Sequence, residues 1–240
     1  MKNILIHYFY DLPSSLYCLF LILIIVSSCN NTSPSKNQVD LSKDLLFTQS
    51  QDFPGPTYER TPKSIKLDNK LKRTEQGIFL NGSSHHIKEK FKYTGKGISV
   101  ALWIKPLEDL KLRTLRKQLT SHFWGSHQFQ YFNGRFIVEL YDEDRTLHVY
   151  YFVVNLPKED RNHVAFSVTA GADVFFYLNG EKFHLGEAPS SLRVVENPLS
   201  IGSIKGKHAY RGWMDDLRTY GRELNQSEIN KLSQNTQDKI

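Results

Sequence analysis

The sequence predicts an all-β fold, an antiparallel two-sheet sandwich with a short C-terminal helix. Predicted strands are marked by apolar residues at every second position. In residues 98–105 the apolar side chains of Ile98, Val100, Leu102 and Ile104 would share one face. Asn-Gly pairs, which tolerate the positive φ angles of tight hairpin turns, occur at residues 81–82, 133–134 and 179–180. Many short strands separated by turn signals are typical of an antiparallel sandwich.

Further elements follow along the chain. Residues 147–154 (LHVYYFVV) are largely apolar, which is typical of a strand covered on both sides. Residues 164–168 alternate again, and residues 174–178 (VFFYL) predict a buried strand that enters a hairpin at Asn179-Gly180. Residues 224–232 (LNQSEINKL) predict one short helix, capped by Asn225 or Ser227.

The N-terminal residues predict export and a lipid anchor. Residues 16–26 (LYCLFLILIIV) are too short for a comfortable membrane-spanning helix but suit the core of a signal peptide. The next residues, Ser27-Ser28-Cys29, complete a segment that resembles a bacterial lipobox, in which the chain is cut before a cysteine that carries lipid. The predicted location is therefore the bacterial cell envelope, in the outer membrane or another envelope membrane. An ordinary secretory signal and an N-terminal anchor helix are the alternatives.

Composition divides the chain into four predicted parts. These are a signal peptide (1–28), the lipidated Cys29 with a flexible tether rich in Ser, Asn, Gln and Pro (29–63), the sandwich (64–234) and a disordered tail (235–240). Cys18 would leave with the signal and lipid would occupy Cys29, so no disulfide and no thiol nucleophile is expected. The net charge of +6 is scattered and accompanies no RNA- or DNA-binding motif, which argues against a nucleic-acid partner.

Four segments stand out when they are taken in order along the chain. They are GIFLNG at 77–82, ISVALWIKP at 98–106, RNHVAF at 161–166 running on to YLNG at 177–180, and GWMDDLRTYGREL at 212–224. Together they resemble the LamG-like jelly rolls of the concanavalin A-like lectin/glucanase superfamily. The resemblance covers roughly residues 75 to 232, and Arg161 stands where that family often has tryptophan. It implies a jelly-roll arrangement of the two sheets.

The resemblance also implies a structural calcium ion. In related folds an aspartate matching Asp215 helps to hold calcium together with backbone carbonyls near the N-terminal strand, here at Asn81 and Gly82. Strand alternation places Asp215 on the same face as Trp213 and Leu217, where a carboxylate needs a hydrogen-bond or metal partner. The alternative is that Asp215 binds backbone N–H groups at the hairpin, because one carboxylate and one amide supply few of the six to eight oxygens that calcium prefers.

Candidate ligand-binding residues lie in the segment HFWGSHQF. Its aromatic and amide side chains, from His122, Trp124, His127 and Gln128, suit the C–H faces and hydroxyls of a sugar. Ordinary core and surface packing is the alternative. The acidic run at residues 139–144 (ELYDED) lacks the spacing of the E-x-D-x-(x)-E pattern of related glucanases, and a retaining hydrolase needs two carboxylates about 5 Å apart. It predicts a hairpin turn, and no catalytic residue is assigned.

Together these features predict an envelope-anchored, non-catalytic recognition module. Its expected partners are the membrane, through lipid on Cys29, and a glycan or a surface protein, bound at the loop end of the sandwich or on its concave sheet. A divergent glycoside hydrolase or lyase and a protein-binding adhesion or structural subunit remain alternatives, because one scaffold can host all three activities.

Overall fold

A computed structural model describes most of the C-terminal part of the chain. The described residues are 41, 43–49, 72–74, 76–81, 85–108, 117–122, 125–203 and 208–234. They all belong to one unit, residues 40–240. The predicted signal peptide, Cys29, Gly82, Trp124 and the predicted tail at 235–240 lie outside the described residues.

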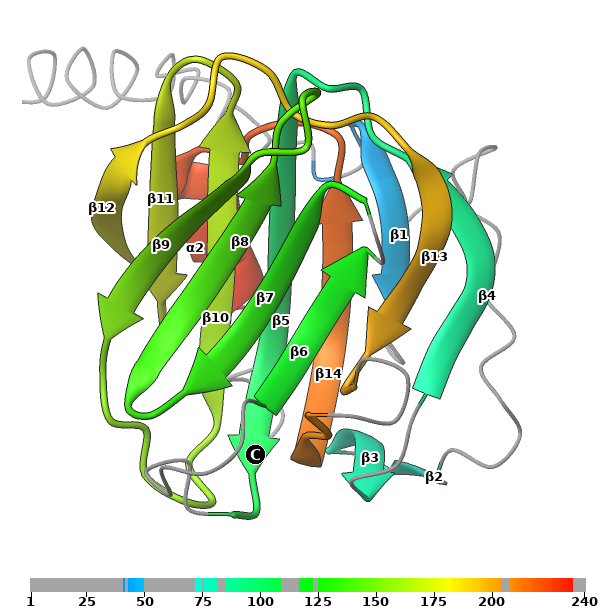
Figure 1. Cartoon of the computed structure of the whole chain (residues 1–240). Helices are drawn as coiled ribbons and strands as arrows, with labels where there is room; N and C mark the ends of the chain where they lie inside the picture. Colours follow the sequence, from blue (N-terminus) through cyan, green and yellow to red (C-terminus); the bar gives the residue numbers. More distant parts are fainter. Residues whose placement is uncertain are drawn as a thin grey trace, which may run out of the picture. The chain divides into compact units, whose positions relative to one another are not determined.

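Two antiparallel sheets face each other and confirm the predicted sandwich (Figure 1). The sheet at the front of Figure 1 has the order β4-β13-β6-β7-β8-β9, and the sheet behind it has the order β12-β11-β10-β5-β14-β3-β2, with β1 also paired to β14. The six-stranded sheet contains β4 (His85–Lys92), β6 (Lys117–His122), β7 (His127–Phe132), β8 (Arg135–Tyr141), β9 (Leu147–Val153) and β13 (Glu196–Ile201). The eight-stranded sheet contains β1 (Leu45–Gln49), β2 (Lys72–Thr74), β3 (Gly77–Asn81), β5 (Gly97–Pro106), β10 (Asn162–Thr169), β11 (Asp173–Leu178), β12 (Glu181–Glu187) and β14 (Arg211–Tyr220).

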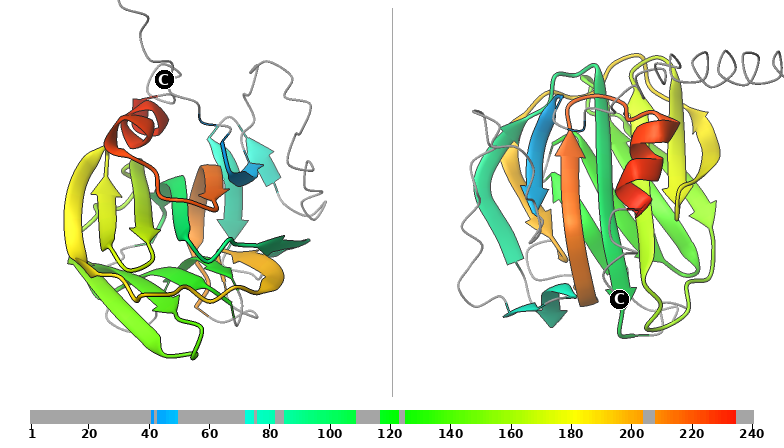
Figure 2. Two further views of the ribbon diagram at one scale, coloured as in Figure 1. Left: turned by 90° about the horizontal axis from the view of Figure 1, so that it is seen from above. Right: turned by 180° about the vertical axis from the view of Figure 1, so that it is seen from behind.

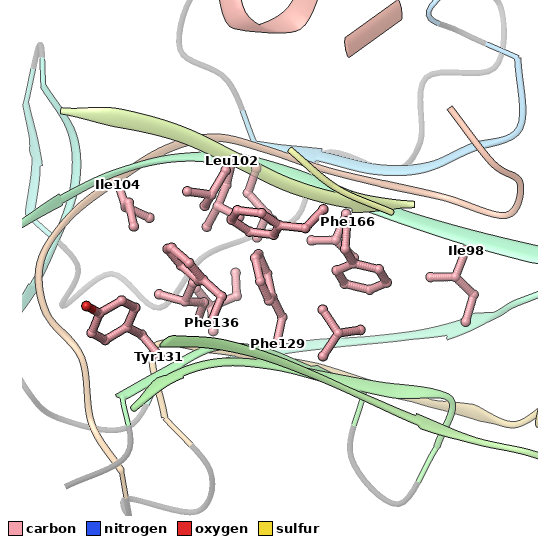
Figure 3. Packing of buried hydrophobic residues seen from close by; sticks show 14 of the residues in the cluster. Ile98, Leu102, Ile104, Phe129, Tyr131, Phe136 and Phe166 are labelled. Carbon is pink, nitrogen blue, oxygen red and sulfur yellow. The ribbon is translucent and has the colours of Figure 1, made fainter. Parts of the chain in front are cut away.

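The core lies between the sheets and follows the predicted alternation. Ile98, Val100, Leu102 and Ile104 on β5 all point inward and are at most 1% exposed. Figure 3 shows three of these side chains together with Phe166, facing aromatic rings of the other sheet that include Phe129, Tyr131 and Phe136. Packing of these side chains across the gap joins the two layers into one core.

The helix α2 (Gln226–Gln234) covers part of the outer face of the eight-stranded sheet, seen from behind in Figure 2. The buried hydroxyls of Ser99 and Ser167 lie 2.7 Å apart, and both accept a hydrogen bond from the backbone N–H of Leu224, just before the helix. These contacts explain why the outer-face serines of two central strands are buried.

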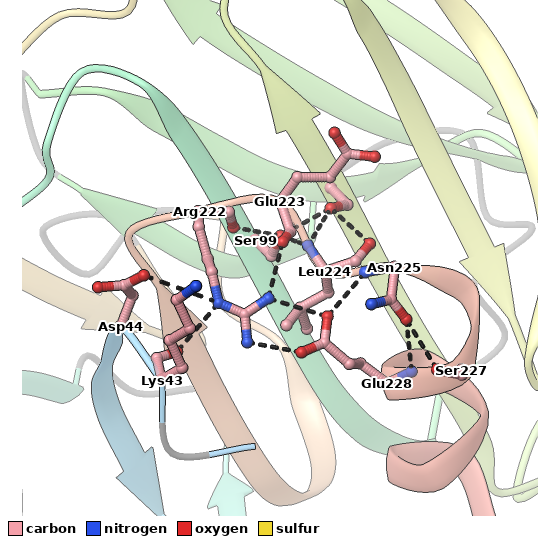
Figure 4. Close-up of polar contacts among 10 residues, drawn as sticks. Lys43, Asp44, Ser99, Arg222, Glu223, Leu224, Asn225, Ser227 and Glu228 are labelled. Carbon is pink, nitrogen blue, oxygen red and sulfur yellow. Dashed lines mark hydrogen bonds and ion pairs between the residues drawn. The ribbon is translucent and has the colours of Figure 1, made fainter. Parts of the chain in front are cut away.

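Asn225 caps the helix, as one of the two sequence alternatives predicted. Its Oδ1 accepts the N–H of Glu228, and the Glu228 carboxylate accepts the N–H of Asn225, which is a capping box (Figure 4). Arg222 donates two further hydrogen bonds to this carboxylate, at 2.8 and 2.6 Å. Ser227 instead donates its hydroxyl to Asn225 Oδ1.

The predicted tether contains a strand of the sandwich. β1 lies within the span 29–63 and pairs antiparallel with β14, from Leu45 opposite Tyr220 to Gln49 opposite Leu217. The predicted start of the sandwich at residue 64 is therefore too late. Composition missed this strand because its few apolar residues are flanked by polar segments on both sides.

A bulge in β14 changes the predicted faces of that strand. The pairing with β5 shifts register between Asp215 and Arg218, and Asp216 has a positive φ of 44°. Met214 and Leu217 therefore both point into the core, while Asp215 lies on the outer face and ion-pairs with Arg161 at 2.9 Å. The prediction that Asp215 and Leu217 share a face is wrong, because the extra residue reverses the alternation.

Three further turns and one strand bear on the sequence predictions. Asn133 and Asn179 both have positive φ angles in tight hairpin turns, as the Asn-Gly pairs predicted. The acidic run ends β8 and forms the turn to β9, where Asp142 accepts the N–H of Thr146 at 2.8 Å. β9 is covered on one face only, because Tyr150 packs inward while Tyr151 is 51% exposed. The prediction of cover on both faces is therefore wrong for this strand.

Candidate functional site

A row of polar side chains crosses the outer face of the six-stranded sheet. The strand registers place Ser200 of β13 opposite Ser121 of β6, Ser121 opposite Gln128 of β7, and Gln128 opposite Glu139 of β8. Strand neighbours of Ser200, Gln128 and Glu139 belong to the hydrophobic core, and Ser121 pairs with the first two of these residues, so all four lie on the face turned away from the core. We call Ser200, Ser121, Gln128 and Glu139 the polar row.

Hydrogen bonds hold the middle of the polar row in position. Gln130 Nε2 donates to Gln128 Oε1 at 3.3 Å, and Gln128 Nε2 donates to the Tyr141 hydroxyl at 3.4 Å. The Gln128 amide is thus fixed between a second amide and an aromatic ring. Gln128 and its neighbour Tyr141 are half-buried, whereas the other three members of the polar row are buried.

One acceptor beside the row has no partner among the described residues. Gln130 is 1% exposed, and its Oε1 accepts no hydrogen bond from this part of the chain. A buried amide oxygen without a donor costs about 1–3 kcal/mol, so a donor small enough to reach this oxygen would be bound favourably. Sugar hydroxyls and water are donors of this kind.

The structure separates the predicted ligand-binding residues. Gln128 lies on the outer face, but His122 and His127 point into the core and are 1% and 0% exposed. His122 pairs with Leu199 and His127 with Leu140, both of which are core residues. The assignment of these two histidines as ligand-binding residues is therefore wrong, because alternation turns them inward. Trp124 lies outside the described residues.

The two histidines form a buried cluster. The Ser126 hydroxyl lies 3.1 Å from His122 Nδ1 and 3.2 Å from His127 Nδ1, and the Tyr93 ring meets both imidazoles edge-on. Burial, with a smaller contribution from His122, holds the pKa of His127 well below its ordinary value. The cluster is a packed part of the core in which burial favours the neutral imidazole of His127.

The predicted calcium ligands do not come together. Asn81 pairs with Arg211 at the start of β14, whereas Asp215 lies four residues further along that strand, beside Gly77 at the other end of β3. At about 3.3 Å per residue, the two positions are separated by most of the β3–β14 pairing. Asp215 also has a cationic partner in Arg161, which stacks over the Trp103 ring at 5.0 Å. Asp215 and Asn81 thus lie apart, the third predicted ligand, Gly82, lies outside the described residues, and a structural calcium ion stays a prediction.

Two features are absent from the described part of the chain. Within this part of the chain no three His, Cys, Asp or Glu side chains gather as the ligands of a metal ion would. Nor does the same part contain a helix long and apolar enough to span a membrane.

Comparison with solved structures shows the fold. The binding domain of botulinum neurotoxin serotype D superposes with a TM-score of 0.61 at 13% identity, over 79% of this chain and 50% of that one. The receptor-binding domain of botulinum neurotoxin mosaic serotype C/D superposes with a TM-score of 0.58 at 16% identity. The ligand-binding domain of serotype D in complex with N-acetylneuraminic acid superposes with a TM-score of 0.55 at 14% identity. Both superpositions cover 72% of this chain and 46% of the other. The chain thus spans about half the length of these neighbours.

Comparison of the sequence itself assigns the family. No curated protein sequence matches the chain. Residues 81–230 match a family model described as the concanavalin A-like lectin/glucanases superfamily, in agreement with the jelly-roll sandwich. Because this match covers more than half of the 240 residues, the chain belongs to the concanavalin A-like lectin/glucanases superfamily.

Proposed function

We propose that this chain is an envelope-anchored, non-catalytic recognition domain that binds a carbohydrate on the outer face of its six-stranded sheet. The polar row supports the proposal most directly, since four adjacent strands align two hydroxyls, an amide and a carboxylate on one face, and the half-buried Gln128 amide is the member within reach of a ligand. Such groups donate to and accept from sugar hydroxyls. The half-buried Tyr141 ring beside Gln128 offers an apolar surface for the C–H groups of a sugar.

The chemistry of the row favours binding over hydrolysis. Glycoside hydrolysis by the common retaining and inverting routes needs a pair of carboxylates, and of the four side chains in the polar row only Glu139 is one. Membership of a lectin/glucanase superfamily is compatible with either activity. A structural neighbour binds N-acetylneuraminic acid, which makes acidic and neutral sugars sensible first probes for this chain.

We predict that replacing Gln128 by alanine weakens glycan binding by about tenfold or more, because the sugar loses an amide that two neighbours hold in place. The test is a glycan array probed with the purified full chain, followed by titration of the best soluble oligosaccharide. Gln234→Ala is the matched control, because Gln234 is an exposed glutamine at the end of α2.

The outcomes separate the three candidate functions. Loss of binding in Gln128→Ala, with an unchanged melting temperature and an unaffected Gln234→Ala, supports the proposal. Binding of no glycan by the wild-type chain would contradict it and leave a protein ligand as the alternative. Release of reducing sugar from a bound glycan would instead establish a hydrolase.

The lipid anchor is the second part of the proposal and rests on the lipobox-like segment ending at Cys29. We predict that Cys29→Ser moves the protein from the membrane fraction to the soluble fraction and abolishes incorporation of labelled fatty acid. Two acyl chains or more are needed for stable anchoring, so the loss of the modified thiol should be decisive. Cys18→Ser is the matched control, and an unchanged membrane fraction for Cys29→Ser would overturn this part of the proposal.

A further inference from the structure

The strand β9 is a free edge of the six-stranded sheet. It lies at the end of the sheet order and pairs only with β8 among the described strands. The N–H of Val154 bonds Gly134 next to β8, and N–H directions alternate along a strand. The N–H and C=O groups of residues 147, 149, 151 and 153 therefore face away from β8, and no hydrogen bond to them is found within the described part of the chain.

The outer face of this free edge is apolar. Leu147, Tyr151 and Val153 are 45%, 51% and 75% exposed, and Val149 lies between them on the same face. They account for three of the four large hydrophobic side chains that are exposed among the described residues, the fourth being Val194. Contacts with β12 of the other sheet use the inner side of β9, where Tyr150 bonds Glu187 and Phe152 stacks near Phe183.

The edge lacks the features by which sheet edges usually avoid pairing. β9 contains no Lys, Arg, Asp, Glu or Pro, and its register with β8 runs without a bulge. By contrast, β12, at the edge of the other sheet, carries Glu181, Lys182 and Glu187 and has a register shift against β11. The sequence of β4, at the far edge of the six-stranded sheet, includes three lysines. Only β9 combines a free backbone edge with uncharged, exposed apolar side chains among these three edges.

We propose that β9 pairs antiparallel with β9 of a second copy of this chain, about a twofold axis at Tyr150. The free N–H and C=O groups belong to odd-numbered residues, so each odd-numbered residue must lie opposite an odd-numbered residue of the second copy. A twofold axis at Tyr150 places Leu147 opposite Val153 of the second copy and Val149 opposite Tyr151 of the second copy. Every outer-face pair across the junction is then apolar.

The charged residues nearest the junction also tolerate this pairing. Arg135 lies opposite Val153, and across the joined sheet the next residues in line would be Leu147 and then the uncharged Tyr141, both of the second copy. Glu139 lies opposite Val149, and the next residues in line would be Tyr151 and then the uncharged Ile137, both of the second copy. No like charges meet, which is the condition for a strand to pair with itself.

The pairing would join two six-stranded sheets into one continuous sheet of twelve strands. Both polar rows would lie on the same outer face, on either side of the apolar strip. Two binding sites that face one surface raise apparent affinity by effective concentration, without any new contact to the ligand. The dimer does not depend on the glycan proposal, because it rests on the edge of β9 alone.

The test is the mass of the purified full chain by sedimentation velocity in density-matched detergent. The expected result is a dimer for the wild type and a shift of at least about tenfold in dissociation constant for Val153→Lys, since two lysines would enter an apolar junction. Leu147→Lys should act in the same way from the other end of the strand. Val194→Lys is the matched control, because it places lysine at an exposed apolar residue outside β9.

Near-ultraviolet circular dichroism on each variant verifies the fold, which substitution at such exposed positions should preserve. A monomeric wild type, or Val153→Lys and Leu147→Lys chains that associate as the wild type does, would overturn the proposal. Equal dissociation by Val194→Lys would overturn it as well. If glycan binding fails while the dimer persists, only the proposed function is lost.

Discussion

Replacing Asp216 by asparagine is expected to lower the free energy of unfolding by about 3–5 kcal/mol, the cost of breaking a buried ion pair. Asp216 Oδ1 accepts a hydrogen bond from Arg218 Nε at 2.7 Å, and the two side chains are 8% and 2% exposed. Asparagine fits the positive φ of residue 216 as well as aspartate does. The loss of unfolding free energy therefore measures the effect of removing the charge and not a strain in the backbone. Urea denaturation of both proteins measures the difference.

The double variant Asp216→Asn/Arg218→Met separates a charge effect from a packing effect. Methionine keeps the apolar stem of the arginine side chain. It also removes the guanidinium charge, which in the single variant has lost the Asp216 carboxylate. The double variant should therefore be more stable than Asp216→Asn alone. A loss below about 1 kcal/mol in the single variant, or a double variant that is less stable than the single, would contradict the assignment.

Acid is expected to destabilise the fold through its buried histidines. Burial, with a smaller contribution from Arg218, lowers the pKa of His163 to about 3. The folded state thus keeps His163 neutral, while the unfolded chain binds a proton below about pH 6.5, so stability is lost as the pH falls from 6.5 toward 3. Between pH 7 and 4.5 this residue should remove about 2.5 kcal/mol, and His127 adds a loss of the same sign.

His163→Phe isolates the contribution of one residue. Phenylalanine keeps an aromatic ring against Trp103, which His163 meets at a centroid distance of 5.4 Å, but it cannot bind a proton. Urea denaturation at pH 7, 5.5 and 4.5 should show a shallower pH dependence than in the wild type. His184→Gln is the matched control, because it removes a histidine that is exposed on β12 and not buried. Equal slopes for wild type and His163→Phe would refute the prediction.

Local sequence patterns predicted much of the fold. Alternation identified β5 and its inward side chains, the Asn-Gly pairs at 133–134 and 179–180 marked two turns, and Asn225 was one of two predicted caps for α2. The bulge at Asp216 was not predicted, since an extra residue in a strand depends on how the partner strand is aligned. β1 was missed because its few apolar residues stand between polar segments, and its pairing with β14, far away in the sequence, leaves no local signal.

The candidate site was predictable only in part. The pattern HQFQYF in β7 sets Gln128 and Gln130 against Phe129 and Tyr131, and strict alternation there also turns His127 inward. That signal was available, and it would have removed His127 from the ligand-binding residues. The polar row itself depends on the alignment of β13, β6, β7 and β8, whose residues span positions 117 to 201. No local pattern contains that alignment.

The most direct test of carbohydrate binding at the polar row is the nuclear magnetic resonance signal of the Gln128 side-chain amide in the isotope-labelled full chain. The signal is assigned by its absence in Gln128→Ala and followed while the best glycan from the array is added. We predict that it shifts in a saturable manner while the signal of Gln234, on α2, stays in place. A bound glycan that leaves the Gln128 amide unmoved and shifts signals elsewhere would contradict a binding site on the outer face of the six-stranded sheet.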